Sequence, residues 1–179
     1  MDVAWEQTIA SMHASGRQVV LAITGGGSGA IAELLRVPGG SRLLLEALVP
    51  YDLAALAAFL GSDPAQASSA ETAVAMAHRA RERAASFAPA GAQLVGLGAT
   101  ASLVSDRPKK GEHRCHIAID TSAGTEACSL VLAKGRRDRA GEEDLVARAI
   151  VLWLARACGV VAPSPAALLD ADEHYAETR

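Results

Sequence analysis

A glycine cluster between a predicted strand and a predicted helix constrains this chain more than any other feature. The run TGGGSG at residues 24–29 follows the apolar residues 19–23 and precedes the amphipathic residues 30–35. Glycine lets the backbone turn sharply, and a helix that begins there directs N–H groups and its positive dipole end at the bend. The spacing matches neither the Walker nor the dinucleotide pattern. The cluster therefore predicts a strand-to-helix turn suited to an anion, with an empty tight turn as the alternative.

Composition limits the size and the partners of the molecule. The 179 residues fit one domain with at most a short appendage. Half of the residues are apolar but only 3% are aromatic, so the core must consist of small aliphatic side chains. The formal net charge is −3, which provides no broad basic surface for a phosphate backbone. We therefore expect no nucleic-acid partner.

The cysteines and the N-terminal residues indicate the compartment. Cys115, Cys128 and Cys158 are odd in number and lack C-x-x-C spacing, which favours buried thiols in a reducing cytoplasm. Residues 1–15 form neither a basic leader nor an uninterrupted apolar stretch. No set of His, Asp and Glu has ligand spacing on one element. These patterns predict a soluble cytoplasmic protein with no membrane partner, no metal and no cofactor.

Hydrophobic periodicity and turn residues predict the order of the elements. Residues 43–49 fit a strand or a helix equally well, and the capping pattern SSAE at residues 68–71 begins a long helix. The predicted helices cover 4–12, 30–36, 52–60, 70–87 and 142–158, the predicted strands cover 18–23, 93–97, 114–120 and 126–132, and a long loop covers 98–110.

This order predicts the fold class. Helices that alternate with strands, followed by a hairpin, are typical of an α/β protein with helices on both faces of its sheet. We expect a three-layer α/β/α domain with a mixed, mostly parallel sheet over residues 1–159. Residues 160–179 are expected to form a C-terminal tail or linker.

The run EHRCH at residues 112–116 is the densest group of titratable side chains. If a strand begins at Arg114, then Arg114 and His116 share one face while His113 and Cys115 share the other. His113 with Glu112 could serve as an acid/base pair near neutral pH, whereas an exposed polar strand start is the alternative, and we favour that alternative for His116.

Cations follow the second predicted strand. Arg107, Lys109 and Lys110 lie in the loop 98–110, where they could close over an anion held by the glycine cluster. A solvated basic loop is the alternative interpretation.

Three motifs resemble those of a known family. Residues 25–41, GGGSGAIAELLRVPGGS, are similar to a segment E-S-C-T-G-G…VPGSS, the tripeptide VPY at 49–51 to V-A-Y, and SAETAVAMA at 69–77 to S-E-E-V-A-x-x-M-A. On these motifs, residues 15–158 resemble the C-terminal domain of the competence-damage-inducible CinA family, whose members include nicotinamide-nucleotide amidases. The resemblance implies a three-layer α/β/α fold with a mixed sheet, and a homo-oligomer.

The resemblance also assigns positions in the site. The nucleophilic serine of the amidases aligns with Thr24, and their lysine base aligns with Leu56, which cannot accept a proton. The family's T-G-I-A-G-P segment aligns with residues 98–103 and places a hydroxyl at Thr100. The runs GLGAT at 96–100 and GEHR at 111–114 resemble a divergent subgroup without the standard Ser/Lys pair.

Together these features predict a domain that binds a small phosphorylated or nucleotide-like ligand. If it hydrolyses an amide of the nicotinamide-mononucleotide kind, Thr24 or Ser28 would attack and His113 would be the base. The alternative is a non-catalytic ligand-sensing or assembly domain of a nucleotide-metabolising protein. The expected ligand-binding residues are Gly25, Gly26, Gly27, Tyr51, Thr100, Lys110 and Arg114.

Overall fold

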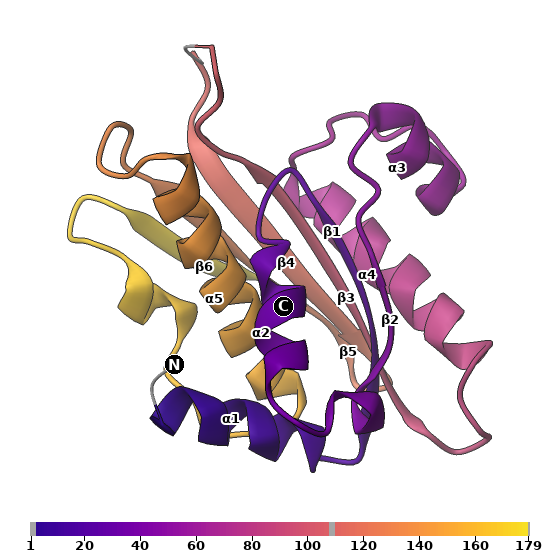
Figure 1. Cartoon of the computed structure of the whole chain (residues 1–179). Coiled ribbons are helices and arrows are strands. Elements are labelled where there is room, and N and C mark those ends of the chain that lie inside the picture. The colour runs from indigo at the N-terminus through magenta and orange to yellow at the C-terminus, as the bar shows by residue number, and fades with distance from the viewer. Residues whose placement is uncertain (1–2, 108–109, 179) are drawn as a thin grey trace.

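A six-stranded sheet in the order β2-β1-β3-β4-β5-β6 forms the middle layer of the molecule (Figure 1). The computed structural model describes residues 3–107 and 110–178. The strands are β1 (Arg17–Thr24), β2 (Leu44–Leu48), β3 (Gln93–Ser102), β4 (His113–Thr121), β5 (Gly124–Leu132) and β6 (His174–Thr178). β1 pairs in parallel with β2 and β3, whereas β3, β4, β5 and β6 pair antiparallel in sequence. The predicted mixed sheet is confirmed, but the expectation that it is mostly parallel is wrong, because the strands from β3 to β6 pair antiparallel.

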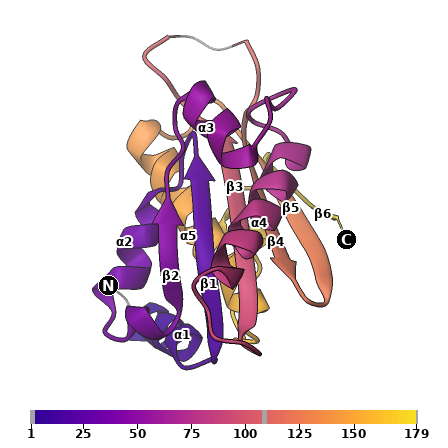
Figure 2. The same ribbon diagram turned by 90° about the vertical axis from the view of Figure 1, so that its right-hand side faces the viewer.

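Helices cover both faces of the sheet, which confirms the predicted three-layer α/β fold (Figures 1 and 2). We call the two sides the α5 face, which also carries α1 and α2, and the α4 face, which also carries α3. No helix among the described residues is long and apolar enough to cross a membrane. The helices are α1 (Val3–His13), α2 (Gly29–Arg36), α3 (Leu53–Leu60), α4 (Ala70–Ala85) and α5 (Arg139–Ala157), with 3-10 turns η1 (Gly40–Arg42) and η2 (Pro165–Leu168).

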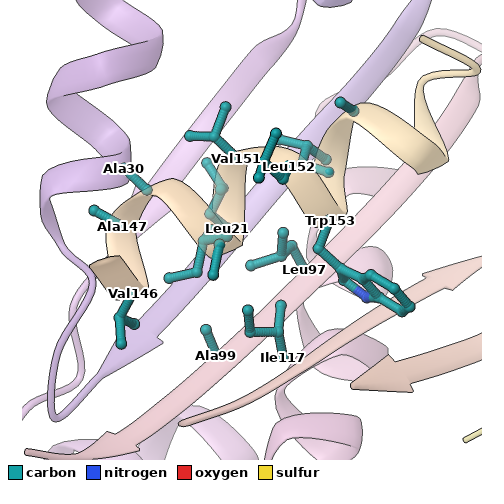
Figure 3. Close-up of a cluster of buried hydrophobic side chains, with 14 of the residues drawn as sticks. Leu21, Ala30, Leu97, Ala99, Ile117, Val146, Ala147, Val151, Leu152 and Trp153 are labelled. Atoms are coloured by element: carbon teal, nitrogen blue, oxygen red, sulfur yellow. The ribbon is translucent and has the colours of Figure 1, made fainter. Parts of the chain in front are cut away.

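The main core lies between α5 and the sheet. Alternate residues of the central strands, such as Leu21, Leu97 and Ile117, point to this side and are fully buried. Figure 3 shows them beneath Val151 and Trp153 of α5. Most of these side chains are aliphatic, as the composition predicted. All three cysteines are buried free thiols, which was also predicted.

The α4 face is packed more closely because two glycines replace side chains. A Cβ atom at Gly98 would lie 2.3 Å from the carbonyl oxygen of Ala73, and one at Gly96 would lie 2.1 Å from that of Ala77. Both carbonyls belong to α4, so the backbone of this helix rests directly on β3. Any side chain at Gly96 or Gly98 would force helix and sheet apart.

Several element boundaries differ from the sequence prediction. Residues 44–48 are a strand, which resolves the ambiguous segment. α4 begins at Ala70 as predicted, with the Ser69 hydroxyl accepting a hydrogen bond from the Thr72 N–H at 3.2 Å, but it ends at Ala85 rather than at residue 87. β3 continues to Ser102, so the predicted loop 98–110 begins only after that residue. The antiparallel pairing with β4 extends the strand, and periodicity within β3 alone does not reveal it.

The C-terminal segment 160–179, expected to be a tail or linker, contributes β6 to the edge of the sheet. Ion pairs hold the preceding loop against residues 133–137. The carboxylate of Glu173 is buried and accepts hydrogen bonds from Arg137 and from the N–H groups of Ala133 (3.0 Å) and Asp170 (2.9 Å). Burial alone would raise the pKa of Glu173, but these hydrogen bonds lower it to about 2.

We expect Glu173→Gln to lower the free energy of unfolding by roughly 2 kcal/mol, because a charge-assisted pair is lost. Asp172→Asn removes an exposed acid from the same loop and should matter much less. Since the folded pKa lies below the ordinary 4.5, the Glu173 contribution is complete above that pH and disappears as the pH falls toward about 2. Urea unfolding at neutral pH and at about pH 3 should show this difference shrinking. A difference independent of pH would contradict the role given to the Glu173 charge.

Candidate functional site

Three loops meet at one edge of the sheet because β1, β2 and β3 run in the same direction. These are the glycine loop (residues 25–28), the segment 49–52 after β2, and residues 103–107 and 110–112 after β3 (Figure 2). Ligands of α/β proteins commonly bind at the carboxyl ends of parallel strands. This edge is therefore the candidate functional site.

The glycine loop is packed tightly between β3 and α5. Gly25 and Gly27 have φ angles of 77° and 88°, in the left-handed region that side chains disfavour. A Cβ atom at Gly25 would lie 1.9 Å from the carbonyl oxygen of Ala101, and one at Gly27 would lie 2.5 Å from the side chain of Ile150. The sharp turn predicted from the sequence is confirmed, and glycine is required at both positions.

The glycine loop holds a carboxylate that belongs to the chain itself. Glu143 of α5 accepts hydrogen bonds from the Ser28 hydroxyl at 3.0 Å and from the Gly29 N–H at 3.3 Å. Arg139 donates to the same carboxylate at 2.9 Å and to the Gly25 carbonyl oxygen at 3.3 Å. Burial opposes the charge of Glu143, but hydrogen bonds from the Gly27 backbone, Arg139, Ser28 and the Gly29 backbone together lower its pKa. Glu143 is thus a carboxylate at neutral pH.

Glu142, the residue before Glu143, binds the segment that follows β3. Glu142 is fully buried, and its two oxygens contact Nδ1 of His113 at 2.7 Å and accept the Val104 N–H at 2.8 Å. The sequence suggested Glu112 as the partner of His113, but Glu112 is exposed and Glu142 takes that place. Sequence reasoning assigned Glu142 and Glu143 only to the helix dipole, because such acids are common in a first helical turn.

Two of the three predicted hydroxyl groups, those of Thr24 and Thr100, lie on the α4 face. Thr24 and Thr100 are register partners on β1 and β3, and both are buried. The Thr100 hydroxyl donates to the carbonyl oxygen of Ala67 at 2.7 Å, just before α4. The His113 side chain points to the α5 face. Ser28 lies on the same side, where its hydroxyl contacts Glu143 of α5. The structure therefore brings Thr24 and Thr100 together and separates both from His113 and Ser28.

Two further polar side chains lie in line with Thr100 on the α4 face, one on β4 and one on β5. His116 is the β4 partner of Thr100, and Ser129 is the β5 partner of His116. Sequence reasoning correctly placed Arg114 with His116 on one strand face and His113 with Cys115 on the other. It missed Ser129, because a single serine in an alternating strand becomes informative only when the register is known.

The remaining predicted ligand residues are spread along the edge. Tyr51 is exposed in segment 49–52. Lys110 is exposed and its carbonyl oxygen accepts a hydrogen bond from Lys134 at 3.0 Å, while Lys109 lies outside the described residues. Arg114 donates to the Ser68 carbonyl oxygen at 3.1 Å, on the α4 face. Leu56, at the position aligned with a lysine base, is fully buried against Ala22 and Met76.

Metal-ligating groups do not gather in the part of the chain that the structure describes. No three His, Cys, Asp or Glu side chains among residues 3–107 and 110–178 are placed to hold a metal ion. On the α5 face, the site consists of the amides and hydroxyl of the glycine loop, Arg139, His113 and the two acids Glu142 and Glu143.

Comparison by sequence found no match for this chain, whereas comparison by structure found proteins of similar fold. No model of a known protein family matches the sequence, and no curated protein matches it. Solved structures of three similar proteins cover most of the chain.

A competence or damage-inducible protein from Enterobacter asburiae has a TM-score of 0.64 and 19% identity, over 87% of this chain and 94% of that one. A CinA superfamily protein from Enterobacter cloacae has a TM-score of 0.62 and 18% identity, over 87% and 89%. The competence/damage inducible protein CihA from Agrobacterium tumefaciens has a TM-score of 0.61 and 17% identity, over 89% and 94%. The fold expected from the sequence motifs is confirmed, and the chain is a CinA-like domain in its architecture.

Proposed function

We propose that this domain binds a small anionic ligand, of the phosphorylated or nucleotide-like class, at the glycine loop, without the Ser/Lys chemistry of an amidase. The main support for this proposal is that the glycine loop already binds a carboxylate, that of Glu143 from α5. The Ser28 hydroxyl, the Gly29 amide and the Arg139 guanidinium already surround a negative group there. The same donors suit the oxygens of a phosphate or carboxylate.

Glu143 makes the proposed binding a competition. A ligand anion has to replace this carboxylate before it can accept the Ser28 and Gly29 hydrogen bonds. Arg139 lies beside both the loop and Glu143, so it supplies a cation to whichever anion is bound. The affinity for an external anion is then the difference between its own interactions and those of Glu143.

The geometry offers little support for amide hydrolysis by the predicted residues. A nucleophilic hydroxyl needs a base within hydrogen-bond reach. Thr24 lies on the α4 face, whereas His113 lies on the α5 face and contacts Glu142. Glu143 does contact the Ser28 hydroxyl, but its lowered pKa makes it a weak base. The proposed function is therefore binding, and the homo-oligomer and cytoplasmic location stay predictions.

The first test is a melting experiment with nucleotides, nicotinamide mononucleotide and inorganic phosphate as probes. A probe at a hundred times its dissociation constant should add about 2.7 kcal/mol to the free energy of unfolding. Arg139→Gln should weaken binding of that probe roughly tenfold, because a charge-assisted hydrogen bond is lost. Arg36→Gln removes an equal charge from the exposed far end of α2 and should bind like the wild type. Indifference of the wild type to every probe, or unchanged binding by Arg139→Gln, would contradict the proposal.

The second test concerns the position aligned with a lysine base. We expect Leu56→Lys to destabilise the domain by roughly 3 kcal/mol or more, because an ammonium group is poorly solvated among Ala22 and Met76. Leu53→Lys on the same helix should be tolerated, since Leu53 is 66% exposed. Urea unfolding measures both changes. Neither variant should release ammonia from nicotinamide mononucleotide, and ammonia release by the wild type that Thr24→Ala abolishes would establish hydrolysis instead.

A further inference from the structure

A serine and a histidine contact each other on the α4 face, away from the glycine loop. Ser129 lies opposite His116 in the β4–β5 ladder, with the serine Oγ 2.7 Å from the histidine Nδ1. Both residues are partly exposed. α4 packs mainly on β1, β3 and β4, so β5 and β6 extend past the helix (Figure 2). The helix therefore leaves this pair only partly covered.

The surroundings of His116 favour a neutral imidazole. Burial lowers its pKa most, the positive charge of Arg114 two residues earlier lowers it further, and the negative charge of Glu71 on α4 opposes both. A neutral ring with its proton on Nε2 leaves Nδ1 free to accept the Ser129 hydroxyl hydrogen. This is the protonation state that a general base requires.

Arg114 supplies a cation beside the pair. It lies on the same face of β4 as His116, and one guanidinium nitrogen donates to the Ser68 carbonyl oxygen at 3.1 Å. Its Nε is buried and has no hydrogen-bond partner among the described residues. Arg114 as a whole is partly exposed, and its positive charge acts on His116, so it can also stabilise negative charge that develops beside Ser129.

We propose that Ser129 and His116 form a nucleophile–base pair that hydrolyses small carboxylic esters, with Arg114 stabilising the oxyanion. Ser129 Oγ forms a bond to the ester carbonyl carbon while its proton passes to His116 Nδ1. The carbon–oxygen bond to the alcohol then breaks, and the alcohol leaves with that proton. A water molecule cleaves the acyl-serine in the same way, gives a carboxylic acid and restores the hydroxyl. This activity is independent of anion binding, because the glycine loop belongs to the α5 face.

A fluorophosphonate probe tests the nucleophile directly. Its phosphorus bonds to an activated serine oxygen, fluoride leaves, and the hydroxyl proton passes to the base. Mass spectrometry of the digested wild-type protein should place the label on Ser129, and the protein should hydrolyse p-nitrophenyl acetate. Ser129→Ala should abolish the labelling. His116→Gln keeps a polar group beside Ser129 but removes the base, so the labelling rate should fall roughly a hundredfold.

Ser122→Ala is the matched control, since Ser122 is an exposed serine in the turn between the same two strands. It should be labelled at Ser129 at the wild-type rate. Absence of label from the wild type, label on another serine, or an unchanged rate in His116→Gln would overturn the proposal. If Ser129→Ala fails to melt cooperatively, the position of the wild-type label and the His116→Gln rate still decide the question.

Discussion

Two adjacent acids at the start of α5 determine the geometry of the candidate edge. Glu143 binds the glycine loop, while Glu142 binds both Val104 and His113. The same helix forms the largest core of the domain against the sheet, so its position is fixed by apolar packing. The loops after β1 and β3 are thus attached to a rigid helix. Glu142 is fully buried and must keep its hydrogen-bond partners, while Glu143 is only partly exposed, so the two acids connect the loops of this edge to one helix.

The strict alternation of strand side chains divides the polar residues into two groups. Thr24, Thr100, His116 and Ser129 are aligned across four strands on the α4 face, whereas His113 belongs to the α5 face. His113 and His116 are three residues apart on β4, so their side chains point to opposite faces of the sheet. The proposed anion site at the glycine loop and the proposed nucleophile Ser129 are therefore physically separate, since the sheet lies between them.

Much of the architecture could be predicted from local patterns, but the partners in the site could not. Periodicity located the central strands and α4, and glycine spacing located the sharp turn after β1. In the sequence, Glu143 looks like an ordinary acid at the start of a helix. In the structure, it accepts a hydrogen bond from the N–H of Gly29, which lies 114 positions earlier. The short strand β6 was missed because HYAET lacks apolar alternation, and its position depends on Glu173 and Arg137 before it. Such contacts depend on the folded register, which no window of sequence contains.

Solved structures that are only 17–19% identical to this chain share its fold, so very different sequences can form the same scaffold. A fold of this kind requires apolar layers and close helix–sheet approach, which small residues such as Gly98 and Ala73 satisfy here. Leu56, where the sequence motifs led us to look for a base, lies in an apolar cluster with Ala22 and Met76. A cation at that place would need an opening to water, and the packed methyl groups of Ala22 and Met76 close it. The chemistry available to this chain must therefore come from side chains that its own edge and strands provide.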